Sequence, residues 1–381
     1  MIKSISGIFV ALMGGLMLSG LGIEAVWAQG DGESLLPRGQ QVGVAGGGIT
    51  GNKLKGKRGV GKGIKGKGLV VKKMTQNGFD LSRCVLDVKE IRGGGPGKGG
   101  IPSIDKPKFV GVGRVDYLKD DDIVLGVVRG KVARAYPTRI LIWHEIVNDV
   151  IGKESIAVTY CPLCGTGMVF DRFVDGKVRR FGVSGLLYRS DVLMYDKEDE
   201  SLWSQLGMKG VSGKSAGKGL KWLVSDHMTW GAWKKKYPEG LVLSTDTGFK
   251  RNYGVNGYVG YLASDRTMFP VPHRRKELGN KAWVIGVIVG GRAKAYLVKG
   301  FKGGQVLGDK IGGQGIFVSY DAKARHPKVV DAKGKKLSSV MVFWFAWQAF
   351  YPETALWSGD IAVKTKDGRK RLGSVKEGCP F

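Results

Sequence analysis

The chain has 381 residues, which suggests two or three core-sized units, and its hydrophobic content of 43% is sufficient for a substantial core. These values exclude a chain that is too polar to fold. The formal net charge is +28, with 61 Lys and Arg against 33 Asp and Glu, and much of the excess lies near the N-terminus. After the first residues, no segment is long and apolar enough to cross a membrane.

The first 28 residues have the features of an export signal. Lys3 precedes an uncharged, largely apolar stretch at residues 4–23, and Val26 and Ala28 put small side chains at the two positions that an export peptidase reads. We therefore expect residues 1–28 to be a signal peptide that is cleaved after Ala28, and the mature protein to be periplasmic or held in the cell envelope. An uncleaved membrane anchor is the alternative.

Residues 29–78 form a basic segment that is rich in Gly and Lys and has very few aromatic residues. Such a segment cannot bury enough apolar area to offset its ordering entropy, so we expect it to be disordered. Its charge favours anionic polymers of the cell envelope or a lipid surface as partners, and not nucleic acid. A solvated spacer without a partner is the alternative.

Ordered structure is expected to begin near Phe79 and to consist mainly of strands. Alternating apolar residues on both sides of Gly130, and again around Asp175-Gly176, predict two β-hairpins. Residues 186–196 predict one extended run. Residues 229–237 predict an amphipathic helix that carries two tryptophans on one face.

An internal repeat divides the folded region. Three segments recur in the same order, the last at a smaller offset: 124–136 as 284–296, 157–160 as 317–320, and 230–239 as 344–353. We therefore predict an α+β fold, predominantly β, with a few short helices and two unequal homologous halves at residues 79–265 and 266–381. Cys161 aligns with Asp321, so the chemistry is expected in the first half, with the second as support.

Two cysteines follow a β-branched run at residues 156–160. Cys161 and Cys164 are three positions apart, and Pro162 and Gly165 favour a turn around them. This arrangement suits a reversible disulfide, a soft-metal clamp or a permanent structural crosslink. Export implies an oxidising compartment for all four cysteines, and elimination would pair Cys84 with Cys379.

Several motifs carry a resemblance to a known family. They are Gly100-Ile101-Pro102-Ser103-Ile104-Asp105, Ala135-Tyr136-Pro137, Trp143-His144-Glu145-Ile146-Val147-Asn148-Asp149, Thr159-Tyr160-Cys161-Pro162-Leu163-Cys164-Gly165-Thr166, Phe181-Gly182-Val183-Ser184-Gly185, Ser201-Leu202-Trp203-Ser204-Gln205 and Leu243-Ser244-Thr245-Asp246-Thr247-Gly248. On these residues the chain resembles the bacterial exported family DUF3179, a domain of unknown function. The resemblance implies no particular activity. The Gly- and Lys-rich composition before Phe79 departs from the family pattern.

The redox interpretation gives each thiol a role. Cys161, which is nearer the strand, would be the nucleophile, and Cys164 the resolving thiol. His144 and Glu145 are candidate catalytic residues because an imidazole beside a carboxylate can act as a base. The alternative for His144 is a buried hydrogen-bond network. The context differs from thioredoxin, because Gly165 and a further strand follow the pair where thioredoxin has a helix.

The metal interpretation uses Cys161, Cys164 and His144 as ligands. Two sulfurs and an imidazole favour copper(I) or zinc. The candidates for completing the set are Asp191, His227 and Asp246.

Four further residues are candidate substrate-binding residues: Arg189, Asp191, Asp246 and Trp203. Because Arg189 and Asp191 are two apart on an expected strand, they should share a face. A salt bridge between them is the preferred explanation, and binding of an anionic substrate is the alternative. The tryptophans are more simply explained as core residues.

The leading functional hypothesis is thiol-disulfide or metal-linked redox chemistry in the cell envelope, with a redox or metal-delivery protein as partner. The alternatives are a non-enzymatic copper or zinc binder, and a structural protein with a permanent Cys161–Cys164 crosslink. The sequence has no nucleophile elbow, phosphate loop, zinc-protease motif or dinucleotide fingerprint. Hydrolase and nucleotide-dependent activities therefore have no support.

Overall fold

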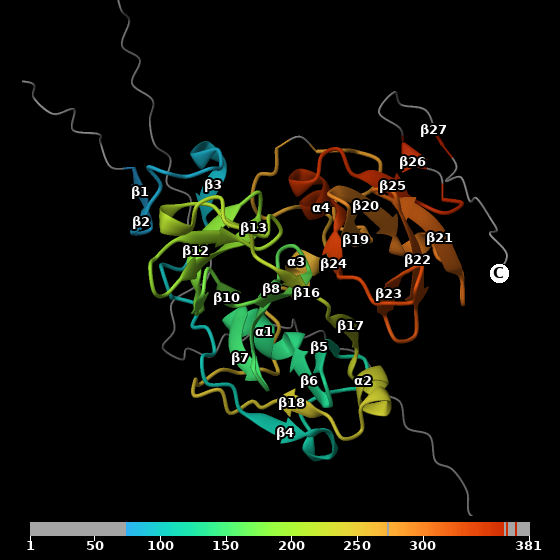
Figure 1. Cartoon of the computed structure of the whole chain (residues 1–381), viewed down its shortest axis with the longest axis horizontal. Helices are drawn as coiled ribbons and strands as arrows, with labels where there is room; N and C mark the ends of the chain where they lie inside the picture. Colours follow the sequence, from blue (N-terminus) through green and yellow to red (C-terminus); the bar gives the residue numbers. More distant parts are fainter. Residues whose placement is uncertain (1–73, 273, 362, 365–369, 372–381) are drawn as a thin grey trace, which may run out of the picture. The chain divides into compact units, whose positions relative to one another are not determined.

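A computed structural model describes residues 74–272, 274–361, 363–364 and 370–371 (Figure 1). The predicted signal peptide, most of the Gly- and Lys-rich segment and Cys379 lie outside these residues, so the expectations for them stay predictions. Within the described residues, the first strand already begins at Thr75, ahead of Phe79. None of the helices in the described part has the length and apolar character needed to cross a membrane.

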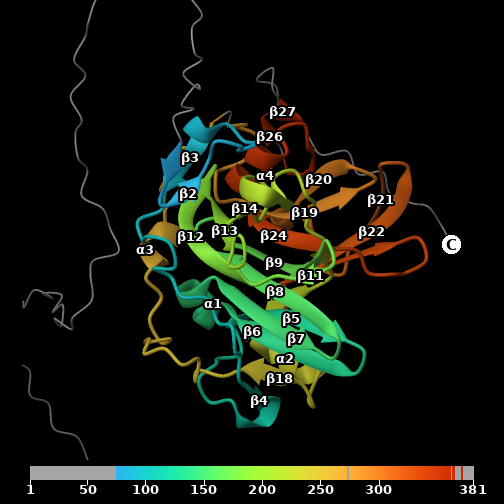
Figure 2. The same cartoon turned by 60° about the vertical axis from the view of Figure 1, so that its left-hand side comes forward.

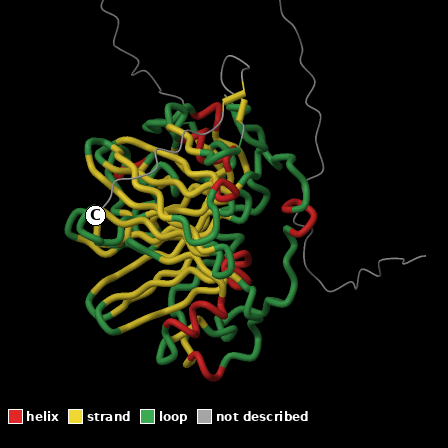
Figure 3. Tube along the Cα trace, turned by 90° about the vertical axis from the view of Figure 1, so that its right-hand side faces the viewer, coloured by secondary structure: helices red, strands yellow, loops and turns green. Residues whose placement is uncertain are grey.

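The described part is predominantly β, as predicted, and its five larger sheets have a β-propeller-like arrangement (Figures 1 and 2). Figure 3 shows that strands make up most of the regular structure. The sheet that carries the cysteines contains, in spatial order, β16 (Trp222–Leu223), β9 (Thr166–Asp171), β8 (Glu154–Cys161) and β7 (Ile146–Ile151). The sheet that carries Asp191 contains β15 (Lys209–Gly210), β14 (Leu202–Ser204), β13 (Asp191–Asp196), β12 (Phe181–Tyr188) and β3 (Ile91–Gly93).

Three more sheets and three ribbons complete the strands. The third sheet contains β17 (Asp226–Thr229), β5 (Ile123–Arg129), β6 (Val132–Pro137), β18 (Leu241–Leu243) and β4 (Phe109–Gly111). The fourth contains β24 (Ser339–Phe343), β19 (Trp283–Val289), β20 (Arg292–Leu297) and β25 (Ala355–Trp357), and the fifth β21 (Val306–Ile311), β22 (Gln314–Asp321) and β23 (His326–Asp331). The two-stranded ribbons are β1 (Thr75–Gln76) with β2 (Phe79–Asp80), β10 (Phe173–Val174) with β11 (Lys177–Val178), and β26 (Val363–Lys364) with β27 (Lys370–Arg371).

The helices of the described part are short. The α-helices are α1 (Thr138–His144), α2 (Trp230–Lys236), α3 (Val259–Leu262) and α4 (Trp344–Phe350), and the 3₁₀ turns are η1 (Val88–Glu90), η2 (Val112–Arg114), η3 (Gly213–Ser215) and η4 (Val298–Gly300). Thr229 caps α2, because its hydroxyl accepts a hydrogen bond from the N–H of Ala232. The helix predicted at residues 229–237 is therefore confirmed. The helix α1, which directly follows β6, was not predicted.

Two predicted hairpins are confirmed, and one predicted strand is wrong. The chain turns at Gly130 between β5 and β6, and at Asp175-Gly176 between β10 and β11. The second hairpin is confirmed only next to its turn, because the flanking strands β9 and β12 belong to different sheets. The run at residues 186–196 is instead a tight hairpin, in which Arg189 (φ 52°) and Ser190 (φ 69°) connect β12 to β13. Such turns usually carry Gly, Asn or Asp at these positions, and Arg189 and Ser190 are none of these, so the turn was not predicted.

A tryptophan ring packs directly against a strand glycine in two of the sheets. A Cβ atom at Gly126 in β5 would lie 1.8 Å from Trp233, and a Cβ at Gly286 in β19 would lie 2.4 Å from Trp347. Each ring belongs to the helix that follows the edge strand, α2 after β17 and α4 after β24. Only glycine lets the indole approach the strand this closely.

A buried carboxylate connects β17 to the segment around β23 and β24. Asp226 lies 3.1 Å from Nε2 of His326 and 2.9 Å from Nζ of Lys336. Burial by itself would raise the pKa of Asp226, but the hydrogen bond from His326 and the charge of Lys336 hold the pKa well below its usual range. Ionised Asp226 therefore contributes to the stability of the fold.

We predict that Asp226→Asn lowers the free energy of unfolding at pH 7 by about 1–3 kcal/mol, because it weakens charge-assisted hydrogen bonds in a buried position. Since the pKa is depressed in the folded state, this difference should persist above about pH 4 and shrink as the pH falls below that value. Urea unfolding at pH 7 and pH 3 measures it, with Asp121→Asn at an exposed site as the control. An equal loss in both variants would contradict the assignment.

Candidate functional site

The two cysteines lie on a tight turn between neighbouring strands. Cys161 is the last residue of β8, the N–H of Cys164 donates to the carbonyl of Cys161 at 3.2 Å, and β9 begins directly afterwards. Gly165 has a φ of 66°, and a Cβ there would lie 2.5 Å from the ring of Trp283. Conformation and packing both require glycine at this position. The predicted turn at a strand end, followed by a further strand, is confirmed.

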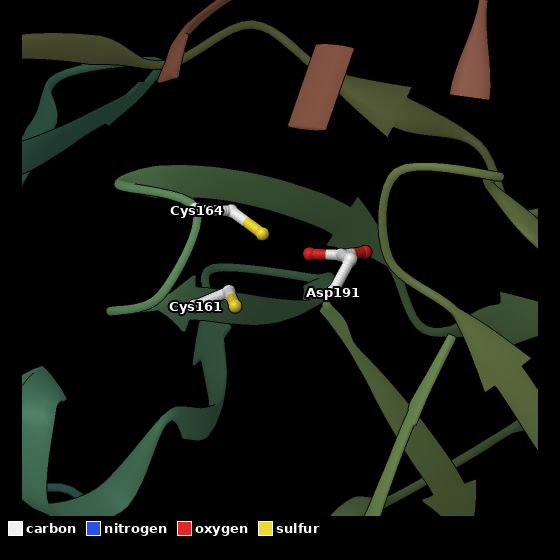
Figure 4. Close-up of side chains that lie close together, drawn as sticks. All are labelled: Cys161, Cys164 and Asp191. Atoms are coloured by element: carbon white, nitrogen blue, oxygen red, sulfur yellow. The ribbon is translucent and has the colours of Figure 1, made fainter. Parts of the chain in front are cut away.

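Both thiols face the carboxylate of Asp191 (Figure 4). The two Sγ atoms and a carboxylate oxygen of Asp191 all lie within 4.8 Å of one another, and all three residues are buried. Oδ2 of Asp191 accepts a hydrogen bond from the N–H of Leu206 at 2.9 Å. Oδ1 has no hydrogen-bond partner among the described residues. A buried carboxylate oxygen in this position requires a proton or a cation.

Burial is the main electrostatic influence on this cluster. It raises the pKa of Asp191 to about 7, and burial together with the charge of Asp191 raises the pKa of Glu145 to about 8. Burial also raises the pKa of the Cys161 and Cys164 thiols. No ion pair joins any of these four groups to a described Lys, Arg or His. Hydrogen bonds from the N–H groups of Leu206 and Val192 and from the two thiols lower the pKa of Asp191 and so offset part of the effect of burial, but no cationic side chain does so.

The backbone around the cluster is constrained. Glu145, which ends α1, has a φ of 55°, and Ser190 in the β12–β13 turn has a φ of 69°. The carbonyl oxygen of Ser190 lies 3.2 Å from Sγ of Cys164 and 3.8 Å from Sγ of Cys161. Buried residues other than glycine rarely adopt these conformations, and they cluster at functional sites. The turn thus puts the Ser190 carbonyl and the Asp191 carboxylate against the sulfurs.

Two contributors to the site were not identified from the sequence. Gln205 accepts a hydrogen bond from Thr166 and donates one to Thr159, each at 2.8 Å, and so ties together the strands on both sides of the cysteine turn. Tyr261 in α3 donates from its hydroxyl to the carbonyl of Leu163 within the turn at 2.8 Å. Gln205 lies in one of the family motifs, and this motif was the sequence signal that could have identified it. Tyr261 lies far along the chain in a segment without a motif.

His144 is not part of the thiol cluster. Its Nδ1 lies 2.7 Å from the carbonyl oxygen of Pro102, and its Nε2 lies 2.7 Å from the hydroxyl of Tyr253. Burial lowers the pKa of His144, so the ring is neutral at pH 7. Since a carbonyl only accepts, Nδ1 donates to Pro102 and Nε2 accepts from Tyr253. Both ring nitrogens thus take part in hydrogen bonds. This is the buried hydrogen-bond network that was the alternative to a catalytic role for His144.

The other predicted residues have different surroundings. Nε of Arg189 lies 2.5 Å from Glu90, so the predicted Arg189–Asp191 salt bridge is wrong, because the turn directs the two side chains apart. Asp246 is exposed and lies 2.6 Å from Lys108. Trp203 is fully buried in the core. Nδ1 of His227 lies 3.4 Å from the carbonyl of Arg325, and His227 does not belong to the thiol cluster.

The three cysteines that the structure describes are free thiols, namely Cys84, Cys161 and Cys164. The disulfide considered for Cys161 and Cys164 is not formed in this state. The partner predicted for Cys84, Cys379, lies outside the described residues.

Comparison with known proteins gives one match. The family described as "Protein of unknown function (DUF3179)" matches residues 98–336, which include the cysteine turn, Asp191, Glu145 and His144. The chain belongs to the DUF3179 family. The resemblance carried by the sequence motifs is therefore confirmed. No curated protein and no solved structure matches the chain. The activity of this DUF3179 protein has to be argued from the geometry of its site.

We predict that Asp191→Asn raises the free energy of unfolding by about 1–3 kcal/mol at pH 8 in the presence of a chelator, because it removes an unsatisfied buried charge. The pKa of Asp191 is raised in the folded state, so the wild type should lose stability relative to the variant as the pH rises from about 4 to 8. Chemical unfolding at both pH values measures this. A destabilised variant at pH 8 would show that the carboxylate has another partner.

Proposed function

We propose that this protein binds one transition-metal ion, zinc in the first place, through Cys161, Cys164 and Asp191. The observation that carries the proposal is the buried carboxylate of Asp191, which has no cationic partner among the described residues and faces two thiols within 4.8 Å. A divalent cation would supply the missing partner. It would also favour the deprotonated forms of all three groups, which burial alone disfavours.

The mixed donor set favours zinc over copper(I). Zinc accepts thiolate and carboxylate ligands together, whereas copper(I) prefers sulfur ligands alone. Two thiolates and one carboxylate would leave a single negative charge around Zn²⁺. The raised pKa of Glu145, about 8, supports this balance, because Glu145 keeps its proton at neutral pH and adds no further negative charge.

Exchange of disulfides with a protein partner has less support. Cys161 is 1% and Cys164 0% exposed, and a large disulfide substrate needs direct access to the attacking sulfur. Burial also raises the pKa of both thiols, which lowers the fraction of reactive thiolate. Redox-active dithiols usually have the opposite shift.

The first test is the metal content of protein that is purified without chelator and under reducing conditions. We expect about one zinc ion per chain in the wild type, little in the Cys161→Ser, Cys164→Ser double variant, and reduced affinity in Asp191→Asn. Cys84→Ser, which changes a thiol outside the cluster, is the matched control and should retain the metal. Elemental analysis and competition with a chromogenic chelator measure both quantities.

The same set of proteins separates the alternatives. Zinc should raise the melting temperature of the wild type more than that of Asp191→Asn. The wild type should therefore be the more stable protein in zinc, whereas Asp191→Asn should be the more stable protein in chelator. Wild-type protein that stays metal-free in zinc-containing buffer would overturn the proposal. A Cys161–Cys164 bond that then reduces at a mild potential would support redox exchange, and one that resists reduction would support a structural crosslink.

We further infer that residues 79–265 and 266–381 are related by duplication. Two features support this. The order β17-β5-β6-β18 corresponds to β24-β19-β20-β25, with the last pair parallel in each sheet. In addition, β8 ends at Cys161 whereas β22 ends at Asp321, the aligned residue. On this inference the second half retains the strand order of the first half but lacks its two thiols.

The site of action is also a proposal. The sequence features of residues 1–28 support export, and on that basis the metal site would function in the cell envelope. The charge of residues 29–78 supports contact with anionic polymers or lipid there. A metal-delivery protein remains the expected partner.

A further inference from the structure

We propose a second site, a pocket for a small organic anion that carries a ring or another flat apolar group. The cavity has a volume of about 580 Å³, within the range of small-molecule sites. Three family motifs meet at it, because its lining includes Pro102, Gly182 and Gly248 from separate parts of the chain. Neither the proposed metal site nor the family description accounts for this convergence.

The lining has a marked excess of positive charge. Among the fifteen lining residues are four cations and one acid, namely Lys106, Lys108, Arg180, Lys197 and Asp105. Cations that gather around a concave surface raise the local concentration of anions. Because three of these cations are ion-paired, the positive charge left for a ligand is mainly that of Lys106, and it favours an anionic ligand.

Three of the four cations form ion pairs, including Lys108 with Asp246 at 2.6 Å. Nζ of Lys197 lies 2.7 Å from Asp105, and Nε of Arg180 lies 2.8 Å from Glu198. The terminal nitrogens of Arg180 make no hydrogen bond within the described part of the chain, and Lys106 has no ion-pair partner there. Lys106 and Arg180 are thus the donors with the most free capacity for a carboxylate or phosphate group.

The rest of the lining suits a flat apolar group. Phe249 is 41% exposed, which is unusual for a large aromatic side chain, and its ring centroid lies 5.3 Å from that of buried His144. Tyr195 lies across Gly182, where a Cβ would come within 2.4 Å of its ring. An aromatic ring that is open to a basic cavity can stack on a planar ligand. The ligand should therefore combine an anionic group with a ring.

His144 connects the walls of this pocket. Pro102 and Thr247 both line it, and His144 bonds directly to the carbonyl of Pro102. Tyr253 bridges His144 to Thr247, whose hydroxyl lies 2.6 Å from that of Tyr253. We therefore assign His144 as a positioning residue for the anion pocket.

Titration calorimetry on the full chain tests the proposal with four probes. Phenyl phosphate and benzoate each carry a ring and an anionic group, benzyl alcohol carries the ring without charge, and inorganic phosphate carries charge without the ring. We expect saturable binding of phenyl phosphate or benzoate, and binding of the other two that is at least about tenfold weaker. Whichever of phenyl phosphate and benzoate binds more tightly shows whether the pocket prefers a phosphate or a carboxylate group. Equal binding of benzyl alcohol would overturn the proposal.

Variants separate the two parts of the ligand. Lys106→Gln and Arg180→Gln should each weaken binding of the ring anion by about tenfold, because each removes a charge-assisted hydrogen bond. Lys131→Gln, at an exposed turn outside the pocket, is the matched control for loss of one charge. Phe249→Ala should weaken phenyl phosphate and leave inorganic phosphate unchanged. A loss in the control as large as in the pocket variants would overturn the proposal in favour of general charge attraction.

The pocket and the metal site can be tested independently. The Cys161→Ser, Cys164→Ser double variant should bind the ring anion with unchanged affinity if it remains folded, which its circular dichroism spectrum checks. Arg180→Gln should in turn keep the metal content of the wild type. Failure of the zinc test therefore leaves the pocket proposal standing, and failure of the anion titration leaves the metal proposal standing.

Discussion

The arrangement around the cysteine turn depends on the burial of the Asp191 carboxylate beside two thiols. Burial raises the pKa of all three groups, and one carboxylate oxygen lacks a partner in the described part of the chain. A fold normally avoids this combination, because an unsatisfied buried charge opposes folding. The proposed cation would remove the conflict. The neighbouring Glu145, with a pKa of about 8, fits the same environment of low polarity.

Backbone geometry and packing hold this cluster with little freedom. Gly165 accepts the ring of Trp283, the Ser190 turn directs a carbonyl at both sulfurs, and Gln205 joins the strands on each side. These groups come from three different parts of the chain. Ligands that are preorganised in this way lose little conformational entropy when a metal binds. The same rigidity makes the cluster poorly suited to attack on a protein disulfide.

The proposed metal site and the proposed anion pocket are connected through two consecutive residues, His144 and Glu145. His144 fixes Pro102 and Thr247 of the pocket, while the next residue, Glu145, lies in the electrostatic environment of Asp191. The last residue of α1 and the residue that caps it thus belong to the surroundings of the two sites. The two sites nevertheless use different ligand-contacting groups, buried thiols in one and exposed cations in the other. This difference is the reason that they can be tested separately.

The sequence by itself determined the predominantly β character, the hairpins at Gly130 and Asp175-Gly176, and the cysteine turn, because local patterning and turn residues specify them. It also pointed to the family through contiguous motifs. Only the tertiary structure decided that Asp191 faces the thiols and that His144 does not. The physical reason is that the positive φ angles at Arg189 and Ser190 reverse the chain. Side-chain alternation along an uninterrupted strand cannot anticipate that reversal, and the groups that meet there come from segments far apart in the sequence.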